Sequence, residues 1–532
     1  MAQSLRFACG LPVLGLMTLG VAVPALRAAP LEDYIARAPF KMPAVPLPSF
    51  PERRFPITDY GAVGDGHALN TQAFAKAIAA CAAAGGGHVI IPAGFWLTGP
   101  IELQSNVDLH SERGALIQFT GDHTAYPMVR RQDWAFVTIS PIDFVPTSPL
   151  EGVDVHNIAV TGEGIFDGAG DTWRPLERDK ATDGQWAADL AKGGVVSNGG
   201  LYWWPTQEAM TGEDFLIDLS RRNPHPTAKE TEPGRDFRRP PLCYFDNCQT
   251  VLVAGITLQN GPCGALCPTR CRDLTIRDLT CFNEWWAQTA DGMDINICQN
   301  VLVYHCWVSA GDDGICLKSS GLDAPKDGMA LRNVIVAECS VYHAHGGFVL
   351  GGYTEDGMKD VWATNCDFMG SDVGIRIKSG VTHGGLVRDV TIDHIYMRDI
   401  ANEAILFDTH YANHPISVRH RTTQDASWFA THTEDTGDKA PGPPVAAATK
   451  IPEFRDFLIS DIYCAGAKTA ISLTGLPNHP IHGITIRNAI ITADKGFHAT
   501  QASDILLQNV QIHTPETPAV SLQDTTNIQF VN

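Results

Sequence analysis

Short runs of alternating apolar and polar residues recur along this chain, and most of them are spaced by roughly 20–35 residues, the length of one coil in a solenoid. Such alternation is typical of strands with one buried face. Asparagine or aspartate precedes most of the runs, and both residue types suit tight turns between strands. The pattern predicts stacked strands of an all-β solenoid. The runs begin at Ile158, Val251, Leu274, Val301, Val334, Val361, Val390, Phe457, Ile484, Ile505 and Ile528.

Four segments between residues 290 and 378 can be superimposed on this repeat. In the common register, their apolar residues form two inward-facing columns, and the positions between and just before them face outward. Strands stacked about 4.8 Å apart would bring the outward charged side chains onto one wall. These charged residues are Asp291, Asp312, Asp313, His345, Arg376 and Lys378. The apolar pairs are Met293/Ile295, Ile315/Leu317, Phe348/Leu350 and Ile375/Ile377.

Helical periodicity appears over residues 72–84, after a candidate cap at Asn70 and Thr71 and before three glycines. A helix here would shield the terminal coil from water and from strand pairing. Residues 168–240 and 411–450 break the repeat and are predicted to be long loops that leave the solenoid. The aromatic residues of the first loop, including Tyr202-Trp203-Trp204, either pack it onto the body or stack against sugars.

The N-terminus has the pattern of an export signal. Arg6 precedes an apolar run from Leu11 to Val23, and small residues follow up to Ala29. We therefore expect residues 1–29 to be a signal peptide, with a buried first helix as the alternative. Residues 30–54 are predicted to be a proline-rich extended lead-in, and residues 55–532 a single catalytic domain. The mature protein is expected to be exported, periplasmic or extracellular, without a membrane anchor.

Composition and charge restrict the partners. The chain has 532 residues, 44% of them hydrophobic, and can bury a large core. Its net charge of -20 argues against binding to nucleic acid or to an anionic membrane. An acidic polysaccharide would also be repelled at long range, so it would need a local basic pocket. Arg376 and Lys378 are candidates for this pocket, and Lys318 is a further one.

Most of the fourteen cysteines fall at repeat positions. Columns of small buried thiols explain this placement, because free cysteine packs as a small hydrophobic residue. Disulfides between neighbouring coils remain an alternative in an exported protein. Cys263 and Cys267 could also pair locally or bind a metal, but no second CxxC-like pair or His pair accompanies them, which argues against a metal. No metal and no cofactor are therefore predicted.

The four charged segments resemble, in order and spacing, the four motifs of the polygalacturonases, glycoside hydrolase family 28. These are Ala290-Asp291-Gly292, Gly311-Asp312-Asp313, His345-Gly346 and Arg376-Ile377-Lys378. Residues 59–66, 97–100, 105–107 and 285–288 are also similar to bacterial exo-acting members. The sequence departs from the family at Thr289, where asparagine is usual, at Ala344, where glycine is usual, and at Cys267, where histidine is usual.

This resemblance implies a right-handed parallel β-helix that hydrolyses α-1,4-galacturonosidic bonds with inversion. The implied substrates are polygalacturonate or related pectic oligosaccharides. It implies that Asp312 is the general acid, that Asp291 and Asp313 orient and deprotonate water, and that His345 supports the acid. Arg376 and Lys378 would hold a substrate carboxylate. Independently, glycoside cleavage needs one protonated and one ionised carboxyl, which neighbouring aspartates can supply.

Exo action is a hypothesis that rests on the 168–240 insertion, which could close one end of a groove. The alternatives are a rhamnogalacturonan or xylogalacturonan hydrolase, a calcium-dependent pectate lyase, and a non-catalytic polysaccharide-binding β-helix. For Asp312-Asp313 the structural alternative is a solvated turn. For Arg376 and Lys378 it is a surface ladder paired with acidic neighbours such as Asp372.

Overall fold

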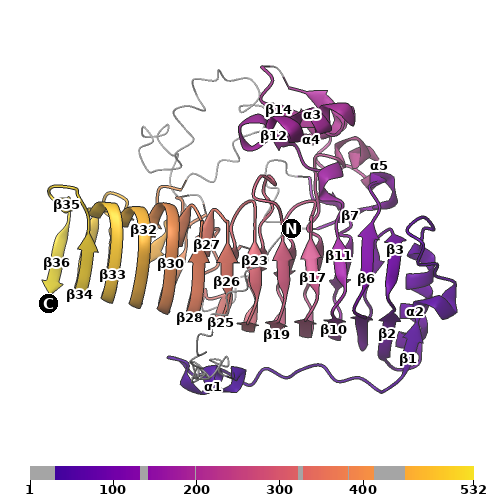
Figure 1. Cartoon of the computed structure of the whole chain (residues 1–532), viewed down its shortest axis with the longest axis horizontal. Coiled ribbons are helices and arrows are strands. Elements are labelled where there is room, and N and C mark those ends of the chain that lie inside the picture. The colour runs from indigo at the N-terminus through magenta and orange to yellow at the C-terminus, as the bar shows by residue number, and fades with distance from the viewer. Residues whose placement is uncertain (1–29, 132–141, 198, 321–327, 382, 412–449) are drawn as a thin grey trace, which may run out of the picture.

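The computed structural model describes residues 30–131, 142–197, 199–320, 328–381, 383–411 and 450–532. Its main body is a parallel β-helix in which each strand pairs with the equivalent strand one coil away (Figure 1). The strands form three long stacks, here called sheets I, II and III in their order along a coil. The predicted solenoid is therefore confirmed. The export signal predicted for residues 1–29 lies outside the described residues.

The strands of each stack have the following bounds. Sheet I contains β4 (Ile101–Glu102), β9 (Leu150–Val153), β15 (Cys243–Asp246), β18 (Leu266–Thr269), β21 (Met293–Asn296), β24 (Ile315–Lys318), β27 (Gly346–Gly352), β29 (Val373–Ser379) and β35 (Val520–Gln523). Sheet II contains β1 (Arg54–Pro56), β2 (Gly87–Ile91), β5 (Val107–Ser111), β10 (His156–Gly162), β16 (Gln249–Ala254), β19 (Arg272–Arg277), β22 (Gln299–Tyr304), β25 (Leu331–Ala337), β31 (Glu453–Phe454) and β36 (Thr526–Val531). Sheet III contains β3 (Gly94–Thr98), β6 (Ala115–Phe119), β11 (Ile165–Asp167), β17 (Thr257–Gln259), β20 (Thr280–Phe282), β23 (Trp307–Ser309) and β26 (Ser340–Tyr342).

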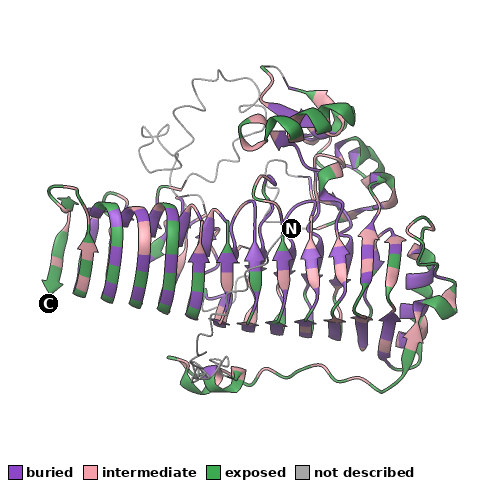
Figure 2. Cartoon of the chain, viewed as in Figure 1, coloured by how far each residue is buried: buried purple, intermediate pink, exposed green. Residues whose placement is uncertain are grey.

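Toward the C-terminus the strands continue around the corners and serve more than one stack. Buried and exposed residues alternate along them (Figure 2), as expected for strands with one face in the core. These long strands are β28 (Met358–Met369), β30 (Leu386–Asp408), β32 (Phe457–Thr474), β33 (Ile481–Thr500) and β34 (Ala502–His513).

The turn between sheets I and II explains the asparagines and aspartates that precede the apolar runs. These residues adopt left-handed backbone conformations, as Asn300 does with φ 59°. Asparagine and aspartate tolerate this conformation better than other non-glycine residues. Their side chains also bond between coils: the Asn300 amide donates to Asp273 Oδ1 at 2.7 Å, and the Asn333 amide donates to Asn300 Oδ1 at 2.8 Å. The predicted turns are therefore confirmed.

The cysteine columns are buried inside these turns. Every cysteine of the described chain is free and buried, including Cys248, Cys271 and Cys298 at the turn between sheets I and II. Their thiols contact backbone carbonyls of the same or the preceding coil, as Cys248 Sγ does with Gly152 O at 3.2 Å. The thiols therefore pack as small core residues, and the alternative of disulfides between coils is not realised.

The N-terminal coil is covered by helix α2 (Thr71–Ala83), close to the predicted range. Phe74, Ile78 and Cys81 lie on its buried face and join the main core. Asn70 occupies the N-cap position, but its side chain does not cap the helix. It instead receives a hydrogen bond from the Val63 N–H at 2.7 Å and donates to backbone carbonyls of the adjoining turn. The predicted capping helix is therefore present.

Residues 30–53 form an N-terminal strap along the outside of sheet II. The prediction of a purely extended lead-in was incomplete, because the strap begins with helix α1 (Leu31–Arg37) and only then becomes extended (Figure 1). Tyr34 of this helix is 1% exposed and packs in a cluster with Leu302, Ile335 and Trp362 of sheet II. The outward apolar side chains of these coils are therefore covered by the strap, which the proline content alone did not reveal.

The insertion at residues 168–240 is not a simple loop, as the sequence had suggested. The N-caps Thr182, Thr206 and Thr227 explain its helices, since each side chain accepts a hydrogen bond from the third residue of its helix. The helices and strands are α3 (Asp183–Ala191), α4 (Gln207–Arg222), α5 (Ala228–Thr231), β12 (Leu176–Glu177), β13 (Val195–Val196) and β14 (Tyr202–Trp204). The predicted 411–450 loop lies almost entirely outside the described residues.

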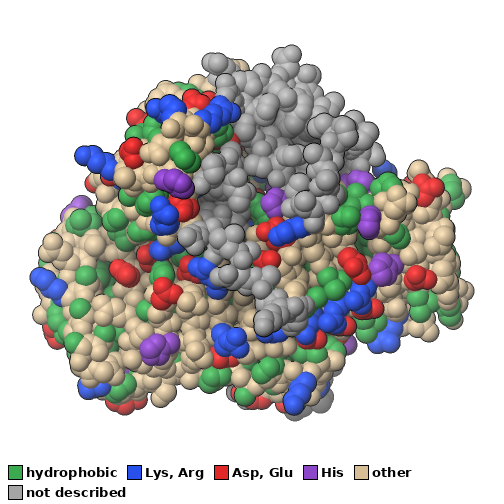
Figure 3. All heavy atoms as spheres, turned by 180° about the vertical axis from the view of Figure 1, so that it is seen from behind, with side chains coloured by type: hydrophobic (Ala, Val, Ile, Leu, Met, Phe, Trp, Pro, Cys, Tyr) green, Lys and Arg blue, Asp and Glu red, His purple; other side chains and the backbone are tan. Residues whose placement is uncertain are grey.

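Smaller elements complete the description. A short antiparallel hairpin, β7 (Met128–Arg130) with β8 (Phe144–Pro146), lies at the side of the β-helix. The single turns of 3₁₀ helix are η1 (Ile57–Tyr60), η2 (His123–Ala125), η3 (Gly170–Thr172), η4 (Arg178–Lys180) and η5 (Glu232–Gly234). From behind, acidic and basic side chains are interspersed over the visible surface (Figure 3), so the excess negative charge is not gathered in one large patch there.

Candidate active site

The strands of sheet I position the charged residues that the sequence singled out. Met293 pairs with Ile315, Ile315 with Phe348, and Phe348 with Ile375. The predicted register is thus confirmed, and both apolar columns are buried in the core. The second column pairs Ile295, Leu317, Leu350 and Ile377 in the same way. Consequently the segments that precede β21, β24, β27 and β29 stack at one edge of sheet I.

Asp291 and Asp313 are tied together by a backbone hydrogen bond. The N–H of Asp313 donates to Asp291 Oδ1 at 3.0 Å, and the carboxyl of one coil therefore contacts the backbone of the next. Both side chains are nearly buried, with exposed fractions of 10% for Asp291 and 4% for Asp313. A solvated turn, the structural alternative for Asp312-Asp313, would leave both carboxyls open to water. Asp313 is instead buried, with 4% of its side chain exposed, whereas Asp312 keeps 27% of its side chain exposed.

Arg376 and Lys378 both contact Asp313. Arg376 Nη1 lies 3.2 Å from Asp313 Oδ1, and Lys378 Nζ lies 2.8 Å from Asp313 Oδ2. Burial raises the pKa of Asp313, but Lys378 and Arg376 outweigh burial and hold this pKa below its usual range. Burial and Arg376 both lower the pKa of Lys378, yet Asp313 keeps it above the ordinary value. The two cations are therefore buried partners of Asp313, not a surface ladder with Asp372.

Asp312 is the most accessible of the three predicted catalytic carboxyls, with 27% of its side chain exposed. Nδ1 of His345 lies 3.2 Å from Asp312 Oδ1, and Nε2 of the same ring lies 3.5 Å from Asp372 Oδ2. Burial raises the pKa of Asp312, but His345, followed by Lys378 and Arg376, holds it well below its usual range. Asp312 is therefore ionised in the free protein, and a ligand can reach it.

Sequence analysis did not single out Asp294 as a site residue and proposed Lys318 only as a further cation. Lys318 Nζ lies 2.5 Å from Asp294 Oδ1 and 3.3 Å from Asp291 Oδ2. Burial lowers the pKa of Lys318, but Asp294 and Asp291 raise it well above its usual value. Burial and Asp294 in turn raise the pKa of Asp291 well above its usual range. The outward position of Asp294, two residues before Asn296 in β21, was the signal that could have revealed this partner.

Tyr411 is a further residue of the site that the sequence did not predict. Its ring lies beside both cations, 4.7 Å from Lys378 Nζ and 5.8 Å from Arg376 Cζ, measured from the ring centroid. Its backbone N–H donates to Ser379 O at 3.1 Å, which fixes the ring next to the end of β29. A cation is attracted to the face of an aromatic ring, so Tyr411 stabilises the charges of this pair.

Metal-ligand clusters and membrane-spanning helices are both absent from the described residues. In this part of the chain no group of three or more His, Cys, Asp or Glu side chains is arranged to hold a metal ion. Cys267 lies near Asp294, with Sγ 3.9 Å from Oδ2, instead of joining Cys263 in a metal site. Across the same ranges, none of the helices combines the length and apolarity needed to cross a membrane.

The chain is therefore a parallel β-helical protein, and its sheet I carries a wall of paired carboxyls and cations. A comparison with family models matches residues 227–428 to "Glycosyl hydrolases family 28", and this range contains all six predicted site residues. The chain is 26% identical over 411 residues to an exo-poly-α-D-galacturonosidase of Dickeya chrysanthemi, covering 72% of this chain and 64% of the relative. It is 23% identical over 448 residues to a probable polygalacturonase of Vitis vinifera, covering 82% of this chain and 73% of the relative.

Solved structures support the same fold. An exopolygalacturonase of Thermotoga maritima superposes with a TM-score of 0.69 at 24% identity, covering 91% of this chain and 95% of that one. A family 28 exopolygalacturonase of Yersinia enterocolitica gives a TM-score of 0.67 at 20% identity, covering 90% and 78%. The resemblance to the family 28 polygalacturonases, and with it the right-handed parallel β-helix, is therefore confirmed. The chain is thus similar in sequence to family 28 polygalacturonases over residues 227–428 and shares the fold of the solved exopolygalacturonases.

Proposed function

We propose that this protein hydrolyses α-1,4-galacturonosidic bonds in pectic polymers or oligomers, with inversion at the anomeric carbon and from a chain end. The observation that carries this proposal is the grouping on sheet I of an accessible Asp312 with Asp291 and Asp313, both nearly buried. Hydrolysis of a glycoside needs a proton donor for the leaving oxygen and a carboxylate that activates water. The grouping supplies both kinds of carboxyl.

The roles follow from accessibility and charge. Asp312 donates its proton to the glycosidic oxygen as the bond from the anomeric carbon to this oxygen breaks. Asp313, whose pKa is lowered after the effect of burial is overcome by Lys378 and Arg376, is ionised and accepts a proton from the attacking water. Asp291 positions this water beside Asp313. The new carbon–oxygen bond forms on the opposite face of the sugar, so the products are a hemiacetal and a free hydroxyl.

Asp312 must take up its proton when the substrate binds, because His345 and the two cations favour the ionised form in the free protein. A galacturonate carboxylate that binds Arg376 and Lys378 would bring a negative charge next to Asp312 and exclude water. Both changes disfavour a charged carboxyl and raise its pKa. Substrate binding would thus protonate the general acid, whereas a substrate without a carboxylate at this position would leave Asp312 ionised.

Exo action has support from the insertion. Arg239 of the insertion contacts Gln288 and Thr289, which directly precede the Ala290-Asp291 segment. Elements that pack this closely beside the catalytic wall would close one end of a binding groove. Export to the periplasm or the exterior is proposed from the pattern of residues 1–29, since a pectic polymer is too large to act on inside the cell.

The test is product chromatography over time on polygalacturonate, with the mature protein beside its Asp312→Asn variant. Galacturonate or one short oligomer from the first time point, absent with the variant, is the expected result. A ladder of oligomers would overturn exo action and keep the hydrolysis. Unsaturated products that absorb ultraviolet light would identify a lyase.

The sequence departs from the family at Thr289, Ala344 and Cys267, so pectins that bear xylose or rhamnose are the second substrates to test. Activity on xylose- or rhamnose-bearing pectins, without activity on polygalacturonate, would identify a xylogalacturonan or rhamnogalacturonan hydrolase. Binding to all of these polymers without product release would identify a polysaccharide-binding protein. Each of these results would overturn the proposed substrate or the proposed reaction.

A further inference from the structure

An open hollow lies at the corner between sheets II and III, in the middle part of the β-helix where Figure 1 labels β23 and β26. It spans three successive coils, because its lining comes from the segments that lead into β20, β23 and β26. The hollow has a volume of about 250 Å³ and is separate from the wall of carboxyls on sheet I. Its polar and aromatic lining residues are Asp278, Thr280, His305, Trp307, Glu338 and Ser340.

The indole ring of Trp307 stands open at this hollow. Trp307 is 40% exposed, and its register partners on the two neighbouring coils are the small residues Thr280 and Ser340. Phe282 of the preceding coil is 42% exposed, and its ring lies nearly parallel to the indole, with an angle of 11° and centroids 6.3 Å apart. The two rings therefore form an aromatic platform at the protein surface.

Hydrogen-bonding groups surround the platform. Asp278 Oδ1 lies 2.8 Å from His305 Nδ1, and both of these side chains are exposed. Glu338 Oε1 accepts a hydrogen bond from the Tyr34 hydroxyl of the strap. An ionised carboxyl has about four lone-pair sites, so both carboxylates can accept further hydrogen bonds, and the Ser340 hydroxyl can donate or accept. The hollow therefore combines an aromatic face with several acceptors, an arrangement that suits a ligand rich in hydroxyl groups.

The charge of the hollow selects among such ligands. Of the described residues that line it, Asp278 and Glu338 carry carboxylates and none is a lysine or arginine. Arg277 lies outside the lining and contacts Asp278 at the surface, where Nη1 is 3.4 Å from Oδ2. Carboxylates repel an anionic ligand at close range, and the net charge of -20 has the same sign. A uronate is therefore disfavoured here, and a neutral sugar is favoured.

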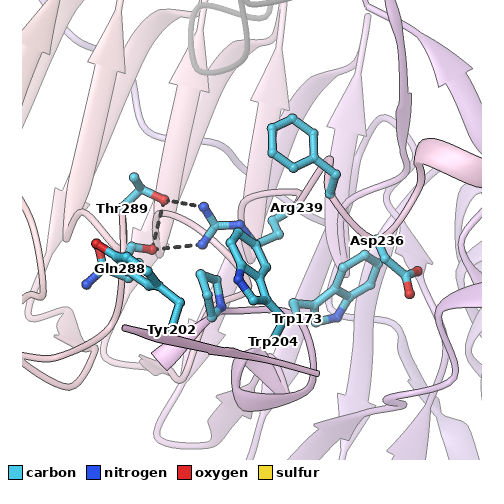
Figure 4. Close-up of a pocket in the computed structure, with 9 residues that line it drawn as sticks. Trp173, Tyr202, Trp204, Asp236, Arg239, Gln288 and Thr289 are labelled. Carbon is cyan, nitrogen blue, oxygen red and sulfur yellow. Dashed lines mark hydrogen bonds between the residues drawn. The ribbon is translucent and has the colours of Figure 1, made fainter. Parts of the chain in front are cut away.

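The recess between the insertion and the β-helix, by contrast, is closed to a sugar (Figure 4). Trp173 and Trp204 are only 0% and 3% exposed there, and His123 covers one face of Trp173 with ring centroids 3.5 Å apart. Arg239 donates from Nη2 to Thr289 Oγ1 at 2.9 Å and so joins the insertion to the body. These aromatic residues of the insertion pack it onto the β-helix, whereas Trp307 is open to a ligand.

We propose that the hollow at Trp307 is a second carbohydrate-binding site, which holds a neutral sugar residue of a polysaccharide. The apolar face of the sugar ring packs on the indole, and the sugar hydroxyls donate to Asp278 and Glu338. Trp307 and Asp312 belong to the same coil, but Trp307 lies in sheet III and Asp312 leads into β24 of sheet I. A polysaccharide held at Trp307 therefore leaves the carboxyls on sheet I free. The inference goes beyond the proposed function and does not require the proposed reaction.

The experiment is affinity electrophoresis of the folded protein in native gels that contain β-1,4-galactan or arabinan, two neutral polysaccharides. We expect at least one of them to retard the wild-type protein, and Trp307→Ala to weaken this binding roughly 10-fold. Trp307→Phe keeps a ring and should retain part of the affinity. The matched control is Tyr463→Ala, because Tyr463 is 48% exposed on the same face, outside the hollow, and stacks on Tyr396 with centroids 5.6 Å apart. The control should bind like wild type.

Three results would overturn the inference. The first is that neither neutral polymer retards the wild-type protein. The second is an equal loss of binding in Tyr463→Ala, which would place the ligand along the whole sheet face instead of in the hollow. The third is that Trp307→Ala weakens binding to polygalacturonate more than binding to the neutral polymers. Near-ultraviolet circular dichroism confirms that each variant is folded.

Hydrolysis of trigalacturonate separates this inference from the proposed reaction. We expect Trp307→Ala to keep the wild-type kcat and KM, because the hollow and the carboxyls lie on different sheets. A rise of KM to the same extent as the loss of galactan or arabinan binding would assign Trp307 to the substrate site and would overturn a separate site. If the wild-type protein hydrolyses no pectic substrate but still binds a neutral polymer through Trp307, the proposed reaction fails and this inference stands.

Discussion

His345 and Asp312 share a contact of 3.2 Å between Nδ1 and Oδ1 in the wall of charged residues on sheet I. Because the histidine favours the ionised carboxyl, the predicted general acid lacks its proton in the free protein. If Asp312 is the general acid, as proposed, it has to take up a proton when the substrate binds, because His345 and the two cations hold its pKa below the usual range. This requirement can be measured directly.

We predict that galacturonate binding is coupled to proton uptake near neutral pH. The pKa of Asp312 lies below the working pH in the free protein and rises on binding, so a proton enters from the buffer. Calorimetric titration in two buffers with different ionisation enthalpies measures this uptake. Asp312→Asn should abolish it. Equal heats in both buffers with wild-type protein would contradict the proposed loading of the acid.

A substrate with a good leaving group should separate the acid from the base. With para-nitrophenyl α-galacturonide the leaving group departs without protonation, so Asp312→Asn should keep most of its activity, while Asp313→Asn should lose it. General acid–base catalysis typically contributes about 10²–10⁴-fold, and this sets the expected loss. The release of nitrophenol gives the rate. If Asp291→Asn is the variant that this substrate rescues, the acid is Asp291, whose pKa is raised by burial and Asp294.

The buried ammonium of Lys318 is predicted to be a large contributor to stability. Lys318→Met would leave Asp291 and Asp294 without their shared cation, and breaking a buried pair costs about 3–5 kcal/mol. The matched control is Lys192→Met, because Lys192 is 52% exposed and pairs with Asp189 at the surface, where the cost is below about 1 kcal/mol. Urea unfolding of the two variants measures the difference. Equal midpoints would show that Lys318 contributes no more than a surface pair.

Asn300 allows a test of the turn ladder. Asn300→Gly keeps the left-handed backbone at φ 59° but loses the hydrogen bonds to Asp273 and from Asn333. Asn300→Ala loses the same bonds and in addition places a Cβ in a conformation that costs about 1–2 kcal/mol. Alanine should therefore destabilise more than glycine, although alanine is the closer side chain in size. Thermal unfolding midpoints give the order, and the opposite order would refute the role of the backbone conformation.

The strap provides a prediction about Tyr34. Tyr34→Phe should lose only the hydrogen bonds with Glu338 and Asn365, at roughly 0.5–1.5 kcal/mol each. Tyr34→Ala should also lose the buried ring, at about 3–5 kcal/mol for a large aromatic residue. Limited proteolysis after residue 30, together with unfolding midpoints, measures whether the strap is released. Similar behaviour of the two variants would mean that the ring contributes little.

The sequence was sufficient to predict the coils because each coil repeats the same alternation of buried and outward residues and the same type of turn. Columns such as Met293, Ile315, Phe348 and Ile375 follow from alternation alone, and their pairing in the structure matches the predicted register. The turns were equally readable, since Asn300 and its equivalents need a residue that tolerates positive φ.

What the sequence did not reveal depends on contacts between elements that do not repeat. Asp294 is one residue of an alternating strand, and only the contact of its carboxyl with Lys318 on the next coil gives it a role. The helices of the insertion were missed although the Thr182 and Gln185 pair forms a capping box, because the break in the coil repeat was interpreted as a loop. The strap cluster around Tyr34 was missed because its partners lie about 300 residues away.

Because the strap and its partners are far apart in sequence, the strap packs onto the β-helix late in biosynthesis. Neighbouring coils meet over short stretches of chain, such as the 27 residues between Asn300 and Asp273, so coils can assemble one after another as the chain is made. Tyr34 and Glu338 are 304 residues apart, and their contact cannot form until most of the solenoid exists. The first residues of the described chain are thus among the last to pack against the rest of the protein. A chain that stops before Glu338 would keep Leu302 and Ile335 but would lack Trp362 and the Glu338 carboxyl, so α1 would have only part of its partners.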